Sequence, residues 1–172
     1  ENGFPVTIVG FNSVAINSEL KEEDYPNLKF ENRLSYVAQV LISRKFSDKL
    51  SLEIAPSVFH ENTLRDILDE NNAVILPNPQ DNTQFAVGLG GRYKLTSRWS
   101  VNVDYAAHLN RASQSNYKNP LSIGVDLETG GHVFQMHFTN AQAMHETGYL
   151  GQTVGDWSKG EIAFGFNLVR VF

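Results

Sequence analysis

The chain has 172 residues, a formal net charge of −5 and 41% hydrophobic residues, which excludes a disordered composition and gives no sign of a nucleic-acid-binding surface. It contains no cysteine, so disulfides, thiolate metal sites and cysteine nucleophiles are excluded. No run approaches the roughly 18 consecutive apolar residues of a spanning helix, so a membrane location would require a β-barrel.

Apolar and polar side chains alternate along eight stretches, which predicts strands with two different environments. Between Trp99 and Leu109, for example, the odd positions are apolar or aromatic and the even positions are small or polar. Strands of soluble proteins average about 5–6 residues, whereas membrane-spanning strands need about 9–11, and most of these stretches belong to the longer class. We expect strands over residues 4–17, 32–45, 49–60, 83–95, 98–110, 120–128, 131–140 and 160–172.

The connections between these strands alternate in length, so that short turns lie at one end of the sheet and long loops at the other. This asymmetry is typical of outer-membrane barrels, and a soluble sandwich or lipocalin-like barrel, the alternative, has no reason to sort its loops in this way. The sequence therefore predicts one all-β domain over residues 1–172, an antiparallel meander transmembrane β-barrel. The short connections are 46–48, 96–97 and 129–130; the longer ones are 18–31, 61–82, 111–119 and 141–159.

The alternation also predicts which side chains face lipid and which face the lumen. The apolar parity is expected on the lipid side, and the polar parity on the inner side, where unpaired polar groups would be costly. We expect lipid contact for Val101, Val103, Val125, Phe134, Met136, Phe164 and Phe166, and inward-facing, hydrogen-bonded side chains for Asp104, Asp126, Gln135, His137 and Asn167.

The stretch GGHVFQMHFTN, residues 130–140, places His132 and His137 five positions apart. Side chains at that spacing face opposite sides of a strand, and on a helix they would be about 140° apart, so neither conformation gives a chelating pair. The stretch is instead typical of a barrel wall that follows a tight glycine turn. We expect no metal site and no cofactor, and His137 is interpreted as a hydrogen-bonded lumen residue.

Charged and ionisable residues of both signs gather on the predicted inner face. They are interpreted as a network of paired charges that fills a narrow barrel, with a polar pore or ligand chamber as the alternative. Ser57 and His60 are the nearest approach to a hydrolase pair, but no nucleophile motif surrounds them, and we expect no enzyme and no catalytic residues. The predicted lumen polar network is Glu53, Arg92, Lys94, Asp104, His108, Asp126, Glu128 and His137.

Two long loops carry apolar residues and are candidate contact surfaces for other outer-membrane proteins. In loop 61–82, Thr63 and Asp66 form an imperfect capping box that would start a short helix, and the apolar stretch AVILPNP follows. Loop 141–159 is rich in large side chains, including Tyr149, Leu150 and Trp157. Each loop either packs on the rim or contacts a partner.

Two stretches, NPLSIGVDLETGGHVFQMHFTNAQAMHE at 119–146 and GDWSKGEIAFGFNLVRVF at 155–172, resemble a family of Bacteroidota proteins known as the DUF5777 family. GFPVTIVGFNSVAIN at 3–17 and LTSRWSVNVDY at 95–105 are similar to earlier strands of that family, so the resemblance covers essentially the whole chain. It implies a β-barrel of unknown function in the outer membrane of a Gram-negative bacterium. It implies no reaction, cofactor or catalytic residue.

Members of that family have further strands before the region matched here, and this chain enters its first strand within a few residues of Glu1. We therefore expect the C-terminal part of a larger barrel, of about twelve strands, in which the strand over 4–17 pairs with a further strand. The expected function is that of a structural or accessory subunit of an outer-membrane complex. A narrow channel for small polar solutes is the alternative, and an outer-membrane lipid-modifying enzyme is a weaker one.

Overall fold

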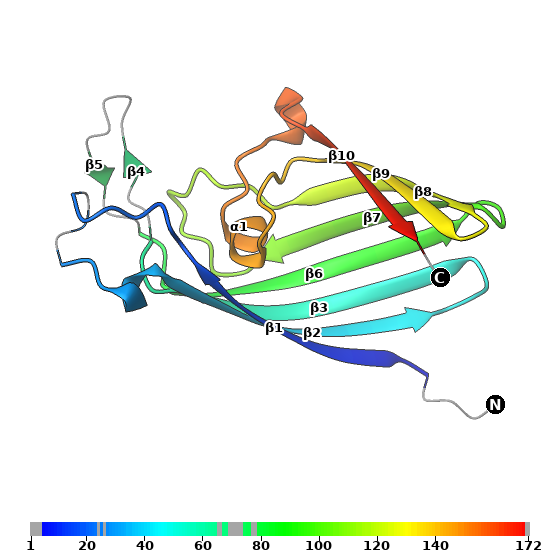
Figure 1. Ribbon diagram of the computed structural model, residues 1–172, viewed down its shortest axis with the longest axis horizontal. Helices are drawn as coiled ribbons and strands as arrows, with labels where there is room; N and C mark the ends of the chain where they lie inside the picture. The colour runs from blue at the N-terminus through cyan, green and yellow to red at the C-terminus, as the bar shows by residue number, and fades with distance from the viewer. Residues whose placement is uncertain are drawn as a thin grey trace.

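The computed structural model describes residues 5–23, 25, 27–64, 67–68, 74–76 and 79–170. Its main element is one antiparallel sheet of eight strands in the order β1-β2-β3-β6-β7-β8-β9-β10, so that each strand pairs with its neighbour along this meander. The sheet curls into a half-barrel (Figure 1), which confirms the predicted all-β meander. Its strands are β1 (Thr7–Ile16), β2 (Leu34–Lys45), β3 (Leu50–Glu61), β6 (Thr83–Lys94), β7 (Trp99–His108), β8 (Leu121–Thr129), β9 (His132–Thr139) and β10 (Ala163–Arg170).

The strand ends lie close to the predicted ones except at the starts of β1 and β10, and β1 begins at Thr7 rather than at 4. β10 begins at Ala163 rather than at 160, because the 3-10 helix η2 (Trp157–Lys159) precedes it and ends at Gly160, whose φ of 73° lies in the left-handed region. Residues 4, 171 and 172, which were also expected to belong to strands, lie outside the described residues.

Short turns join β2 to β3, β6 to β7 and β8 to β9, and all other connections in the sheet are longer, as the sequence predicted. The tightest turn consists of Gly130 and Gly131, which both have positive φ, 50° and 127°. Two-residue hairpin turns of this kind need positive φ, which glycine adopts without strain. Long connections therefore gather at one end of the half-barrel, where the other short elements lie.

The register assigns each side chain to one of two faces of the sheet. Asp126, for example, is paired with Ser100 on β7 and with Gln135 on β9, so the three side chains share one face. The short helix α1 (Glu146–Gly151) lies on this same side, within the curl of the sheet (Figure 1). This side is the inner face, and the opposite, convex side is the outer face.

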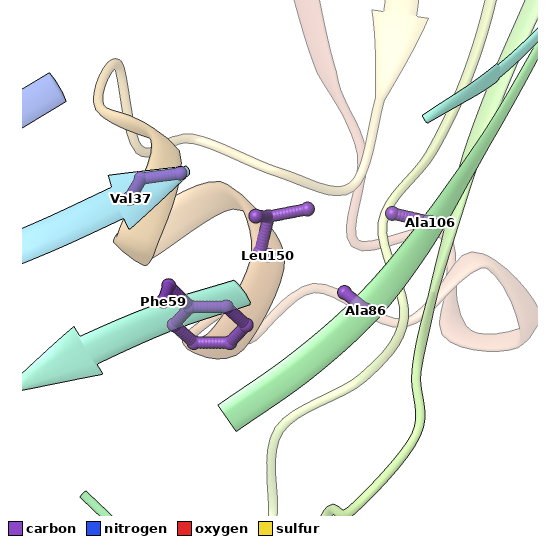
Figure 2. Close-up of a cluster of buried hydrophobic side chains, with 5 residues drawn as sticks. All are labelled: Val37, Phe59, Ala86, Ala106 and Leu150. Carbon is purple, nitrogen blue, oxygen red and sulfur yellow. The ribbon is translucent and has the colours of Figure 1, made fainter. Parts of the chain in front are cut away.

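A small apolar core lies between α1 and the inner face near the long-loop end. Leu150 of α1, 2% exposed, sits among Val37, Phe59, Ala86 and Ala106, which come from β2, β3, β6 and β7 (Figure 2). Since most large hydrophobic side chains of the sheet point outward and are exposed, this cluster, rather than a filled two-sided core, holds most of the buried hydrophobic residues in the described part of the chain.

The expected helix at Thr63–Asp66 is not supported by the described part of loop 61–82. Ile67–Leu68 and Val74–Leu76 form the two-stranded hairpin β4–β5, and residues 65 and 66 lie outside the described residues. Another 3-10 helix, η1 (Phe30–Arg33), precedes β2. In the described ranges, no helix has the length and apolarity needed to cross a membrane.

β1 and β10 are the two edges of the eight-stranded sheet. Within the described residues, no ladder of hydrogen bonds joins them, so the curl is open along that side. The edge strand β1 is exposed over much of both faces, including Val9 on the inner face and Ile8 on the outer face.

Candidate functional site

All eight residues of the predicted lumen polar network lie on the inner face, but they form separate groups rather than one network. Arg92, Asp126 and Glu128 lie together near the short-turn end. Glu53 and Asp104 lie on either side of Gly90 in the middle of the sheet. Lys94, His108 and His137 are apart from both groups, and Lys94 makes no ion pair with the described residues.

Arg92 connects β6 to β8 across the intervening strand. Its Nε lies 3.5 Å from Asp126 Oδ2, and its Nη2 donates a hydrogen bond of 2.5 Å to Glu128 Oε1. Ser100, on β7 between them, accepts from Arg92 Nε at 3.0 Å and lies 3.4 Å from Asp126. Asp126 is 4% exposed, and Gln135 also donates to it at 3.3 Å. This buried carboxylate is therefore paired and hydrogen-bonded, as its burial requires.

His108 packs at a tilt of 53° against an aromatic ring rather than joining a polar network. Its ring centroid lies 5.4 Å from that of Phe59, and the residue is 9% exposed. Neither ring nitrogen makes a hydrogen bond with the described residues. His108 therefore lies on the inner face at the end of β7, beside the apolar core.

Residues 145–153, here called the inward segment, fold back into the half-barrel and contain α1. The sequence predicts that this loop packs on the rim or contacts a partner, and it does not predict that the loop enters the lumen. The only local signal is its content of Tyr149, Leu150 and two glycines, which does not distinguish a lumen segment from a packed surface loop.

Side chains of three strands hold the inward segment. Ser13 of β1 donates to Glu146 Oε2 at 3.0 Å. Tyr149 donates its hydroxyl to Asp104 of β7, and Gln152 Nε2 donates to both carboxylate oxygens of Glu61 on β3, at 2.9 and 2.8 Å. Burial, followed by the charge of Asp104, raises the pKa of Tyr149 above its usual range, so the hydroxyl remains a donor.

Backbone contacts to the long loops also fix the inward segment. Lys118 N donates to Thr153 O at 2.7 Å, and Arg111 Nη1 donates to Gly151 O at 3.4 Å. Burial lowers the pKa of Arg111. A Cβ at Gly151 would lie 2.9 Å from Phe59 Cε2, so glycine allows the close approach of α1 to β3.

His137 lies in a row with two glycines that face it from both neighbouring strands. Gly124 of β8 and Gly165 of β10 are its paired residues. A Cβ at Gly124 would lie 2.9 Å from His137 Cβ, and a Cβ at Gly165 would overlap the imidazole. The ring therefore occupies space over the wall that any other residue at 165 would fill. Beside it lies a cavity of about 220 Å³ on the inner face of β7 to β10.

The family of the chain follows from a match to a family model described as a membrane-bound beta barrel domain (DUF5777), which covers residues 1–172. The chain belongs to this family. No curated protein matches the chain. No solved structure matches it either.

For a membrane-bound DUF5777 barrel, the outer face is the surface that meets lipid. Every residue predicted to contact lipid lies on that face, with Val103 43% exposed, Phe164 60% and Phe166 54%. Conversely, Asp104, Asp126, Gln135, His137 and Asn167 share the inner face. The expectation that all five are hydrogen-bonded is wrong for His137 and Asn167, whose side chains make no hydrogen bond with the described residues, because no polar side chain on the neighbouring strands lies within reach of them. Because one face is apolar and the other polar along the same strands, the sheet has the alternation of a transmembrane barrel wall.

The described residues of this DUF5777 chain include no group of three or more His, Asp or Glu side chains that could hold a metal ion. Ser57 and His60 lie on opposite faces of β3. Ser57 is buried on the inner face, where it donates to Ala55 O and accepts from Gln39, whereas His60 bonds Thr83 on the outer face. The structure does not bring these two side chains together as a nucleophile and base.

Proposed function

We propose that this membrane-bound barrel is an outer-membrane protein of a Gram-negative bacterium of the Bacteroidota, and that it is a structural or accessory subunit of an outer-membrane complex. Short turns at one end and long loops at the other are typical of barrels in that membrane. The observation that carries the subunit role is the inward segment, because it occupies the half-barrel at the long-loop end, where a solute would enter a channel.

The contacts of the inward segment support a closed lumen rather than a mobile flap. Leu150 is 2% exposed and Thr153 is also 2% exposed, and side-chain hydrogen bonds join the segment to β1, β3 and β7. A loop with buried apolar contacts and bonds on three strands opens at a free-energy cost well above that of a fraying terminus.

Conductance in planar bilayers tests this proposal, using the purified wild-type protein and a variant in which residues 145–153 are replaced by a glycine-serine linker of equal length. The proposal predicts no conductance steps for the wild type and steps for the variant. Conductance steps of the wild type as large as those of the variant would contradict it and favour the alternative, a narrow channel for small polar solutes, and a variant without steps would contradict it as well. The cavity beside His137 is the observation that supports this alternative.

A partner, if the subunit role holds, would be another outer-membrane protein that contacts the long loops 61–82 and 141–159. In loop 141–159, the large side chains of the inward segment point into the half-barrel. Met144, 100% exposed, and Val154, 62% exposed, are therefore the large apolar side chains of this loop that a partner could contact. Co-purification from native membranes, with Met144→Glu as the test variant and Lys45→Glu at the opposite end as its control, should lose the partner only with Met144→Glu. Equal recovery with both variants would contradict this contact.

A lipid-modifying enzyme is the weakest alternative, and we propose no catalytic role, because Ser57 and His60 face opposite sides of the sheet. We also propose that the edges of β1 and β10 pair with further strands in the membrane, in a barrel of about twelve strands, since each unsatisfied backbone group in lipid costs several kcal/mol. Hydrogen exchange of the protein in bilayers tests this pairing. Slow exchange at every amide of β1 is expected, and fast exchange at alternate β1 amides would contradict closure.

A further inference from the structure

The cavity on the inner face of β7 to β10, here called the chamber, opens to the lumen, has more apolar than polar surface on its walls and is large enough for one small molecule. Its volume is about 220 Å³, and the side chains that matter for binding are Asn102, Asp104, Asp126, Gln135, His137 and Asn167. Sites for drug-sized ligands enclose about 300–1,000 Å³, so the chamber fits a smaller solute. It lies between the Arg92 cluster at the turn end and the inward segment at the loop end.

Two glycines flank the His137 side chain at the chamber. Gly124 and Gly165 face His137 from the adjacent strands, and the imidazole lies over Gly165, where a larger side chain would overlap it. A Cβ at Gly124 would lie 2.8 Å from Met136 O, which also requires glycine. The row Gly124–His137–Gly165 therefore places a polar ring against the wall of the chamber.

Some of the polar groups at the chamber are committed to other partners. Asp126 is bound by Arg92, Ser100 and Gln135. One oxygen of Asp104 accepts from Tyr149. By contrast, the side chains of Asn102, His137 and Asn167, and the second oxygen of Asp104, have no hydrogen-bond partner among the described residues. The chamber thus presents two primary amides, one imidazole and one carboxylate oxygen to a ligand.

The chemistry of these free groups selects the ligand class. An anion would meet the carboxylates of Asp104 and Asp126 and is repelled. A small cation satisfies the carboxylate but has no acceptor for the N–H donors of Asn102, Asn167 and His137. A hydroxyl group both donates and accepts, so a molecule with several adjacent hydroxyls satisfies the amides, the imidazole and the carboxylate together.

We propose that the chamber binds a small, uncharged, polyhydroxylated solute of monosaccharide size. Binding does not require conduction, so this inference goes beyond the subunit role and stands whether or not the lumen conducts. The Tyr149–Asp104 hydrogen bond orients one wall of the chamber, so the inward segment shapes the site without filling it.

Saturation-transfer NMR on the purified protein in detergent micelles tests the proposal, with D-glucose and myo-inositol as the polyol probes and methylammonium and acetate as charged probes. Saturable, millimolar binding of at least one polyol is expected, with no saturable signal from the charged probes. Asn102→Ala should weaken polyol binding about five- to tenfold, the effect of one lost hydrogen bond. Asn167→Leu, a second chamber variant, should weaken binding at least as much, because the larger apolar side chain also enters the chamber.

Ser43→Leu is the matched control, because Ser43 faces the inner side of β2 outside the chamber and gains the same leucine. Its polyol binding should equal that of the wild type. Each variant is first checked for the heat-modifiable mobility of a folded barrel, and the two chamber variants serve as alternatives if one does not fold. No saturable binding of either polyol, equal or tighter binding of methylammonium or acetate, or an equal loss with Ser43→Leu would each overturn the proposal.

Discussion

The hydroxyl of Tyr149 donates a hydrogen bond to the carboxylate of Asp104, which lies 45 residues earlier in the chain, on β7. This bond connects the inward segment to the middle of β7. Together with Ser13–Glu146 and Gln152–Glu61, it ties one short helix to three strands of the wall. The position of α1 is therefore set by side chains that are distant in sequence.

Tyr149→Phe should loosen the inward segment without unfolding the sheet. A hydrogen bond to a charged group contributes about 1.5–3 kcal/mol, and because Asp104 is exposed to the lumen we expect a loss of about 1 kcal/mol in the free energy of local opening. Hydrogen exchange at residues 146–153 measures this opening. Tyr93→Phe, on the outer face, is the control and should leave exchange there unchanged; equal exchange in wild type and Tyr149→Phe would contradict the bond.

The same bond predicts a pH dependence with a definite sign. Burial raises the pKa of Tyr149 in the folded protein above the value of about 10 that it has when unfolded, so its contribution is fully present below pH 10 and declines as the pH rises above it. Protection of residues 146–153 should hold up to about pH 10 and fall above it, whereas Tyr149→Phe should lack this fall.

Leu150→Ala should destabilise the long-loop end by leaving a cavity. Leu150 is 2% exposed among Val37, Phe59, Ala86 and Ala106, and truncation of a buried leucine costs about 2–5 kcal/mol (Figure 2). Urea unfolding in detergent, followed by tryptophan fluorescence, measures the change. Leu168→Ala on the outer face of β10, where Leu168 is 55% exposed, should cost less than about 1 kcal/mol in the same assay. Equal costs for the two variants would contradict the burial of Leu150.

Arg92→Met should destabilise the short-turn end because it leaves the buried Asp126 without its cation. Breaking a fully buried pair costs about 3–5 kcal/mol, and since the Arg92 side chain is 37% exposed we expect about 2 kcal/mol. The double variant Arg92→Met, Asp126→Asn should recover most of the loss, because no buried charge remains unpaired. A double variant as unstable as the single one would show that the pair does not stabilise the wall.

Much of the sheet could be predicted from the sequence, because alternation is a local property of each strand. The period of two in residues 99–109 is sufficient to assign Val103 outward and Asp104 inward, and the hairpin turns then set the register between neighbours. The family match follows from the same stretches. The start of β10 lies three residues after the predicted one, because a 3-10 helix precedes the strand and has no period of two.

The inward segment could not be predicted, because no local pattern records where a loop folds. Ser13 and Glu146, 133 residues apart, become neighbours only when the sheet curls. The grouping of the polar residues could not be predicted either. Alternation along the strands assigns Arg92 and Glu128 to one face, but only the curl of the sheet and the length of the arginine side chain bring them together across β7. Nothing in the local sequence around Gly124 and Gly165 predicts that the His137 ring lies over Gly165 or that a cavity lies beside it.

Val103→Arg should interfere with insertion into a bilayer, because it places a charge on the outer face near the middle of β7. A cost of about 2–4 kcal/mol is expected for arginine at the bilayer midplane. Asn102→Arg, one residue earlier and on the inner face near Asp104 and Asp126, is the matched control and should insert normally. Folding yield into lipid vesicles measures both; equal yields would contradict the assigned faces.

A spin-label scan of β7 in lipid bilayers shows directly whether this sheet is a membrane-spanning barrel wall. A nitroxide at each position from Trp99 to His108 would be probed with oxygen, which partitions into lipid, and with a water-soluble nickel complex. A membrane-spanning wall gives a period of two, with oxygen contact highest at the odd positions and nickel contact highest at the even positions. Odd positions that are as accessible to the nickel complex as even ones would contradict it.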